Sequence, residues 1–212
     1  RESKSGLSLL IKNPLTVLGL SIVLLLFLVA LFAPSLAPFP EQGLGLSNLQ
    51  ERLEPPSMQH ILGTDQLGRD ILSRLIMGSR VSLQAGVVVI LFVTIIGTPL
   101  GLIAGYYGGF IDNCIMRLSD LFLAFPPLLW AIAIVSALGP NLMNAMLALS
   151  IPWWPWYARL IRGQVLSLKE MEFVESARSL GASDLRIMFR HILPNSLSPI
   201  IVQATMDLGY II

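Results

Sequence analysis

Three long runs without a charged residue constrain this chain of 212 residues more than any other feature of its sequence. They cover residues 15–32, 81–111 and 121–158. As a helix, the first run would extend roughly 27 Å, close to the ~30 Å of a bilayer's hydrocarbon core. Composition agrees, because 54% of the residues are hydrophobic and only 13% are charged, against about 25% charged in soluble domains. The sequence therefore predicts an all-α, polytopic membrane protein.

The run 15–32 is predicted to be a membrane span rather than a cleaved signal peptide. It is longer than the ~7 to 15 apolar residues of a signal peptide core. The Ala33-Pro34-Ser35 sequence that follows it is also a poor cleavage site. We therefore divide the chain into an N-terminus with the first span (1–33), a water-exposed segment (34–80) and a core of further spans (81–212).

The core is predicted to contain four further spans, the last of them incomplete. Residues 81–111 supply one span, which Pro99 is expected to kink. Residues 121–158 are long enough for two spans joined by a turn at Gly139-Pro140-Asn141. The chain becomes apolar again after Pro194 and stops at Ile212, so we expect the fifth span of the chain to be truncated.

The water-exposed segment contains an amphipathic stretch from Gly63 to Arg80. Its apolar residues have helical spacing and its arginines lie opposite them, which predicts an interfacial helix whose arginines reach lipid phosphates. Asp65 and Asp70 are candidates for a carboxylate pair in acid–base chemistry, but no nucleophile lies near them in the sequence. We therefore expect Asp65 to cap this helix.

Three glycines in the second charge-free run are spaced four residues apart, at Gly97, Gly101 and Gly105. Residues at this spacing share one face of a helix, and small residues there let a second span approach closely. The alternative is that the glycines merely fill a membrane helix. Three glycines in register favour helix packing over that alternative.

Two kinds of side chain are candidates for lining a polar pathway through the spans. Trp153 and Trp156 lie in an aromatic cluster near the end of a predicted span, where an interfacial aromatic belt is the commoner arrangement. Asp207 falls inside the last predicted span, where a carboxylate costs ~2.5 to 3.5 kcal/mol on insertion scales. We expect Asp207 to face protein or water rather than lipid.

The segment 169–194 is the longest well-charged stretch in the second half of the chain. Phe173, Ala177 and Leu180 have helical spacing, and an apolar set with the same spacing follows Gly181, namely Leu185, Met188, Phe189 and Ile192. Gly181 is expected to end the first helix, and Ser183 and Asp184 to begin the second. Two short amphipathic helices joined by a glycine turn suit docking into a groove on another protein.

This segment resembles a known motif. Glu175-Ser176-Ala177, then Gly181, then His191-Ile192-Leu193-Pro194 resembles the EAA loop of permease subunits of bacterial ABC importers. Every spacing of that motif is kept, with Ser176 in place of its first alanine and His191 in place of an isoleucine. Residues 63–80 resemble a segment of the peptide and nickel branch of the same family, so the resemblance extends over most of the chain.

The resemblance implies a type I importer permease (MetI-like) core preceded by one extra N-terminal span. It also implies that the loop docks an ATPase through Phe173, Glu175, Ala177, Leu180, Gly181, Leu185, Phe189, His191 and Pro194. The expected partners are a second homologous permease subunit, two ABC ATPase subunits and an extracytoplasmic substrate-binding protein, in the bacterial inner membrane. The expected substrates are di- or oligopeptides, with nickel and glutathione as alternatives.

Several functions are excluded or disfavoured by the residues themselves. No Gly-Lys pair of a phosphate-binding P-loop occurs, so ATP and magnesium are expected in partner subunits and no cofactor in this chain. One cysteine, Cys114, and two separated histidines form no metal-ligand cluster and no disulfide. An intramembrane enzyme would need paired ionisable groups, and Asp120 and Asp207 have no His, Ser or Glu partner. Nucleic acid is not an expected ligand.

Charge also indicates the orientation of the chain in the membrane, and it favours a loop that docks to a protein over one that binds anionic lipid. Six of the 14 Lys and Arg residues cluster around the 169–194 loop, on the same side as the N-terminus if four spans separate them. The positive-inside rule then places both in the cytoplasm. A channel or scaffold whose loop binds anionic lipid would need a basic face, whereas acidic residues nearly balance the bases of this loop.

Overall fold

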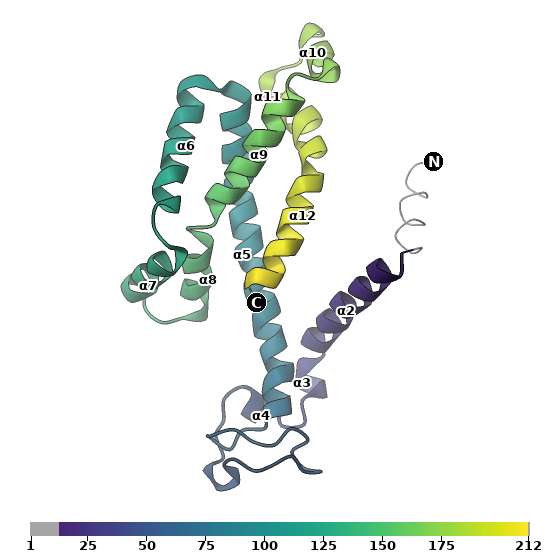
Figure 1. The fold of residues 1–212 in the computed structure, drawn as a ribbon, viewed down its shortest axis with the longest axis vertical. Coiled ribbons are helices and arrows are strands. Elements are labelled where there is room, and N and C mark those ends of the chain that lie inside the picture. The colour runs from purple at the N-terminus through teal and green to yellow at the C-terminus, as the bar shows by residue number, and fades with distance from the viewer. Residues whose placement is uncertain (1–12, 212) are drawn as a thin grey trace. The chain divides into compact units, whose positions relative to one another are not determined.

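The computed structural model describes residues 13–211, and within that range it consists of helices joined by loops, with one isolated bridge between Thr64 and Asp70 and no β-strand. The chain divides into two units, one ending at Gln84 and the other beginning at Ala85. Figure 1 follows the helices in chain order. The predicted all-α class is confirmed for the described residues.

The first unit begins with α2 (Pro14–Leu31), which is long and apolar enough to cross a membrane. Asn13 caps it, since its side chain accepts a hydrogen bond from the Leu15 amide at 3.0 Å. Its side chains are apolar on every face, as expected of a helix in lipid. Three short turns follow, α3 (Ala33–Leu36), α4 (Pro40–Gly43) and η1 (Leu49–Glu51).

Residues 63–70 form a loop, and the predicted interfacial helix is wrong as a separate element. The helix α5 (Ile71–Tyr107) begins immediately after this loop and runs on without interruption. Asp70, rather than Asp65, caps it, because its Oδ2 accepts from the Ser73 amide at 2.7 Å. Asp65 instead organises the loop, accepting from the amides of Leu67 and Arg69 and pairing with the guanidinium groups of Arg69 and Arg74. These partners hold the Asp65 pKa well below its usual range, although burial opposes the shift.

In the second unit, the predicted pair of spans over 121–158 is divided differently. The helices here are α6 (Gly109–Leu123), α7 (Pro127–Leu138), α8 (Leu142–Ser150) and α9 (Trp154–Leu168). The axes of α6 and α7 meet at 85°, where adjacent prolines at 126 and 127 interrupt the backbone hydrogen bonds. The turn after Leu138 lies where it was predicted, with Gly139 at φ +90° and Asn141 capping α8.

The number of helices able to cross a membrane differs from the predicted number of spans. Among the described residues, α2 and α5 are long and apolar enough, and the bent pair of α6 and α7 adds a third if it is one span. The remaining apolar segments are split by prolines into helices that are too short alone, or, in the helix α12 (Leu193–Ile211), contain polar residues along their length. Pro99 lies inside α5, which continues through it.

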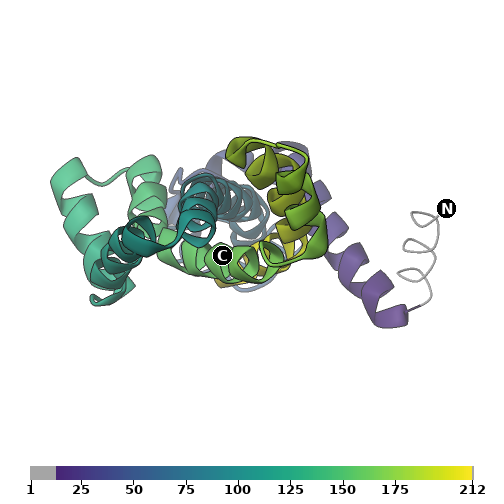
Figure 2. The same ribbon diagram turned by 90° about the horizontal axis from the view of Figure 1, so that it is seen from above.

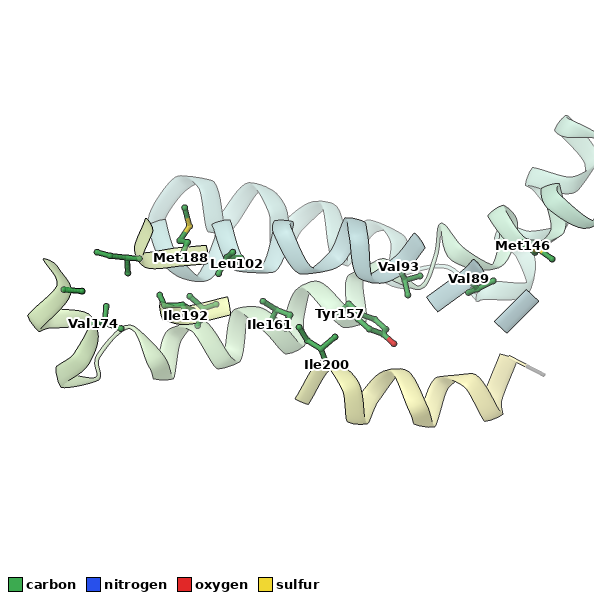
Figure 3. Close-up of a cluster of buried hydrophobic side chains, with 13 residues drawn as sticks. Val89, Val93, Leu102, Met146, Tyr157, Ile161, Val174, Met188, Ile192 and Ile200 are labelled. Carbon is green, nitrogen blue, oxygen red and sulfur yellow. The ribbon is translucent and has the colours of Figure 1, made fainter. Parts of the chain in front are cut away.

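The core of the second unit lies where α5, α9 and the segment from α10 (Glu172–Ser179) to α12 meet (Figure 3). Its fully buried side chains include Leu102, Tyr157, Ile161 and Ile192. Seen from above, α9 runs beside α5 (Figure 2). The glycines explain the close approach, because a Cβ on Gly97, Gly101 or Gly105 would lie 2.6, 2.3 or 2.7 Å from atoms of α9. Such distances leave no room for a side chain on this face of α5.

Candidate functional site

The candidate site is the loop between α9 and α12, which begins with the helix α10 (Glu172–Ser179). This helix ends in a Schellman motif: the Ala182 amide donates to the Ala177 carbonyl at 3.1 Å, and the Gly181 amide to the Arg178 carbonyl at 2.9 Å. Gly181 has φ +80°, a left-handed conformation that glycine adopts without a Cβ clash. The glycine turn expected from the sequence is therefore present.

The second half of the loop is not a separate helix. The turn α11 (Asp184–Ile187) leads into the π-helical turn η2 (Met188–Ile192), which continues directly into α12. In the π turn the Leu193 amide donates to Met188, five residues back. Pro194 therefore falls in the first turn of α12, where its missing N–H is tolerated. The second of the two predicted short helices is therefore not a separate element, and the loop is continuous with α12.

One face of the loop is anchored in the core of its own unit. Its buried residues pack in the same cluster as Leu102 and Ile161, and they are Val174, Ala177, Ile187, Met188 and Ile192. Ala177, assigned from the sequence to the surface that meets an ATPase, lies on this inward face, as do Met188 and Ile192. The inward packing fixes the position of the loop on α5 and α9.

The loop also exposes large apolar side chains. The exposed fractions are 40% for Phe173, 88% for Leu180, 64% for Leu185 and 55% for Phe189. Gly181 and Pro194 are also exposed, and His191 is half-buried. Among the described residues nothing covers these four large apolar side chains, which lie within a segment of about 17 residues, and exposed apolar side chains of this kind are typical of an interaction surface. We call Phe173, Leu180, Leu185 and Phe189 the outer face.

Polar groups lie beside the outer face and tie the loop to the end of α5. The Tyr106 hydroxyl donates to Asp184 Oδ1 at 2.6 Å. A polar cavity of about 360 Å³ opens here, and its lining consists of Tyr106, Lys169, Glu170, Glu175 and Arg178. The exposed carboxylate of Glu175 thus lies among both acidic and basic groups, at an open pocket next to α10. This mixed charge agrees with the absence of a basic face in the sequence.

The three candidates for a polar pathway differ in burial and in their contacts. Asp207 is buried in α12, where Gln203 Nε2 donates to its Oδ1 at 3.0 Å, and its Oδ2 has no hydrogen-bond partner among residues 13–211. The aromatic ring of Trp153 packs against Tyr210, 5.2 Å away between centroids. Trp156 is exposed. Asp207 therefore faces protein, as expected. Trp153 packs against another aromatic ring, whereas the side chain of Trp156 is exposed.

Sequence reasoning missed two ion pairs that join α6 to α9. Arg162 binds Asp112 in a bidentate arrangement, with Nη2 2.6 Å from Oδ2, and Arg159 pairs with Asp120. The partners are 50 and 39 residues apart, so no local pattern links them. The sequence did contain a signal for these ion pairs. Arg159 and Arg162 are three residues apart and Asp112 and Asp120 are eight apart, so each set lies toward one face of its helix.

Comparison with known proteins adds independent evidence. Residues 97–212 match the family model described as binding-protein-dependent transport system inner membrane component, and residues 7–56 match the N-terminal TM domain of oligopeptide transport permease C. Together these matches extend over both units and include the whole candidate site.

Three relatives illustrate the similarity. A dipeptide transport system permease protein of Alkalihalophilus pseudofirmus is 49% identical over 93% of this chain and 64% of its own length. A glutathione transport system permease protein of Pectobacterium atrosepticum is 47% identical over 88% of the chain and 62% of its own length. A probable D,D-dipeptide transport system permease protein of Escherichia coli is 44% identical, over 93% and 65%. The chain thus spans less than two thirds of the length of these relatives.

Proposed function

The chain belongs to the family of inner membrane components of binding-protein-dependent transport systems, and from this membership we propose that it is the permease subunit of an ATP-driven importer. The observation that carries the proposal is the outer face, an exposed apolar surface on a loop anchored in the permease core. A soluble partner that binds this face would be mechanically linked to α5, α9 and α12. In this proposal the partner is an ATPase.

The proposed complex contains a second homologous permease subunit, two ABC ATPase subunits and an extracytoplasmic binding protein. ATP and magnesium bind in the ATPases, and this chain holds neither. The N-terminus and the 169–194 loop face the cytoplasm, an orientation supported by the basic residues around both regions. Residues 34–70 then lie on the opposite, extracytoplasmic side of the membrane.

The proposed mechanism is mechanical. Closure of the two ATPases around ATP moves the docked loop, and the loop transmits the movement because η2 continues into α12. The ion pairs of α6 with α9 and the glycine contacts of α5 with α9 move these helices as one body. Rigid-body rocking of such a bundle against a second permease subunit opens the pathway alternately to each side of the membrane.

The proposed substrate is a di- or oligopeptide. Two of the three relatives described above carry dipeptide transport in their names, and the match over residues 7–56 is to an oligopeptide permease domain. Glutathione, itself a tripeptide, is the second candidate because of the relative from Pectobacterium. Nickel is a third candidate, supported by the family branch that residues 63–80 resemble.

Replacing Leu180 by alanine is expected to weaken binding of the ATPase more than replacing Glu175 by glutamine. Leu180 is a large apolar side chain at the glycine turn, and truncating an anchor that becomes buried on binding commonly costs ~2 kcal/mol or more. Glu175 is a rim charge, which mainly affects the rate of encounter. The measurement is the amount of ATPase that copurifies with each full-length variant at matched expression.

The matched control for Leu180→Ala is Leu197→Ala, a comparably simple truncation of an exposed leucine on α12 outside the loop. It should retain wild-type recovery of the ATPase. Equal losses for Leu180→Ala and Glu175→Gln, or an equal loss for Leu197→Ala, would count against the outer face as the docking surface.

A further inference from the structure

A fully buried histidine in the first unit takes no part in the proposed transport mechanism. His60 lies in the loop between η1 and α5, with no side-chain exposure. Its ring packs against Phe39, with 4.9 Å between the ring centroids. Its backbone amide donates to the Ser57 hydroxyl at 3.0 Å. A buried ionisable ring in an otherwise exposed, loop-rich segment calls for a physical explanation.

Each ring nitrogen of His60 faces a carboxylate. Nδ1 lies 2.9 Å from Asp70 Oδ1, a hydrogen-bond distance, and Nε2 lies 3.3 Å from Glu51 Oε2, an ion-pair contact without hydrogen-bond alignment. Asp70 is itself held in place: its Oδ2 caps α5 and its amide donates to Gln42 of α4 at 2.8 Å. The ring therefore connects η1 to the first turn of α5.

The protonation state of the ring decides whether this arrangement is stable. A neutral imidazole has one N–H and one lone pair, so in either tautomer a lone pair would point toward a buried or half-buried carboxylate. The imidazolium has an N–H on both sides and matches both carboxylates. Glu51 and Asp70 are the titratable groups that face the ring, whereas Phe39 from the start of α4, Ser57 and Ser73 of α5 contribute no charge. The positive form is thus the one that fits.

The direction of the pKa values agrees with the geometry. Burial disfavours the charged ring of His60, but its hydrogen bond to Asp70 and the charges of Asp70 and Glu51 outweigh burial and raise its pKa above 6.5. Burial likewise opposes ionisation of Asp70, yet the Ser73 amide and His60 hold its pKa below 3.8. Because the pKa of His60 is higher in the folded protein than in the unfolded chain, protonation of the ring stabilises the fold. This stabilisation is complete at a pH below the pKa of the unfolded chain, and it is lost as the pH rises through the pKa of the folded protein. At the acid end, the stabilisation that Asp70 contributes is lost as Asp70 takes up a proton.

We propose that Glu51, His60 and Asp70 form a proton-dependent clasp, which holds the 44–70 segment against the start of α5 while the ring is protonated and releases it when the ring loses its proton. The clasp makes the packing of this segment on its helix sensitive to the pH of the compartment it faces. It does not depend on the identity of the transported substrate or on ATPase docking.

The test is hydrogen exchange of the full-length protein in detergent, followed by mass spectrometry of peptides covering residues 44–70. After correction for the intrinsic pH dependence of exchange, the protection of these peptides should fall at least about tenfold between about pH 6 and about pH 9. In Glu51→Gln the fall should begin at lower pH, because one of the two charges that favour the imidazolium is gone. The matched control, His191→Gln, replaces the other histidine of this sequence and should leave the pH dependence of exchange in residues 44–70 unchanged.

The variant His60→Gln should lose the pH dependence. An unchanged pH dependence in His60→Gln, or the same transition in Glu51→Gln as in the wild type, would overturn the proposal. If His60→Gln does not fold, the Glu51→Gln comparison and the ring NMR shifts of wild-type His60 decide. A ring that is already neutral at about pH 6 would also overturn the clasp.

Discussion

Replacing Gly101 by alanine is expected to leave little folded protein extractable from the membrane. A Cβ at this position would lie 2.3 Å from the Ala158 carbonyl oxygen and 2.9 Å from the Ile161 Cβ, and a backbone atom cannot rotate away. Helices α5 and α9 must therefore separate, which also disturbs the core that anchors the loop. Overpacking of this kind costs ~1 to 3 kcal/mol or more. The measurement is the monodisperse fraction in detergent and its midpoint of thermal unfolding.

The matched control for Gly101→Ala is Gly163→Ala. Gly163 lies in the interior of α9, and a Cβ there would meet no atom within 4 Å. Alanine favours a helix over glycine by ~0.8 to 1.0 kcal/mol, so this variant should be at least as stable as the wild type. The two glycine-to-alanine changes thus have opposite expected signs. Equal unfolding midpoints for both would show that α5 and α9 do not pack through the glycine face.

Replacing Gly181 by valine is expected to abolish most transport while leaving the protein in the membrane at normal abundance. Gly181 has φ +80°, which costs other residues ~1 to 2 kcal/mol and a β-branched residue more. Relief of this strain opens the Schellman turn and moves α11 relative to α10. The side chains of the outer face then no longer keep the arrangement that the ATPase is expected to bind. We expect copurifying ATPase to fall by about tenfold, the equivalent of ~1.4 kcal/mol.

The control for Gly181→Val is Gly163→Val, the same change at a helical glycine with open space around it. It should retain both transport and ATPase recruitment. Wild-type transport in the Gly181→Val protein would contradict the role given to the turn. A protein absent from the membrane would instead show that Gly181 is required for folding rather than for docking.

Local sequence patterns predicted the elements of the docking loop but not the direction in which they face. The glycine turn and the start of the second helix at Ser183 followed from capping preferences that act within a few residues. Apolar periodicity, in contrast, shows only that a helix has an apolar face. It does not distinguish a face buried in the chain's own core from one left for a partner, and so Ala177 was assigned to the docking surface although it is buried.

Three other features were not predicted from the sequence, one because a local signal was overlooked and two because they depend on contacts between distant residues. The bend between α6 and α7 was readable in principle from the adjacent prolines 126 and 127, but the charge-free run was treated as uniform. The pairing of Arg162 with Asp112 joins residues 50 positions apart. The contacts of His60 likewise join η1, a loop and the cap of α5. Glu51, His60 and Asp70 do not follow a helical or strand period in the sequence. Tertiary packing, rather than local propensity, determines the ion pair and the contacts of His60, whereas the bend follows from the two local prolines.

Docking of an ATP-hydrolysing subunit on the outer face is tested most directly by site-specific cross-linking in the full-length protein. The native cysteines, Cys114 among them, are replaced, and a cross-linker is attached through Leu185→Cys, a position that is 64% exposed. Ile187→Cys, two residues away and fully buried in the core, is the control. We predict an adduct between Leu185→Cys and a nucleotide-binding protein, identified by mass spectrometry, and none from Ile187→Cys. A Leu185→Cys protein that transports normally yet forms no such adduct would contradict docking at the outer face.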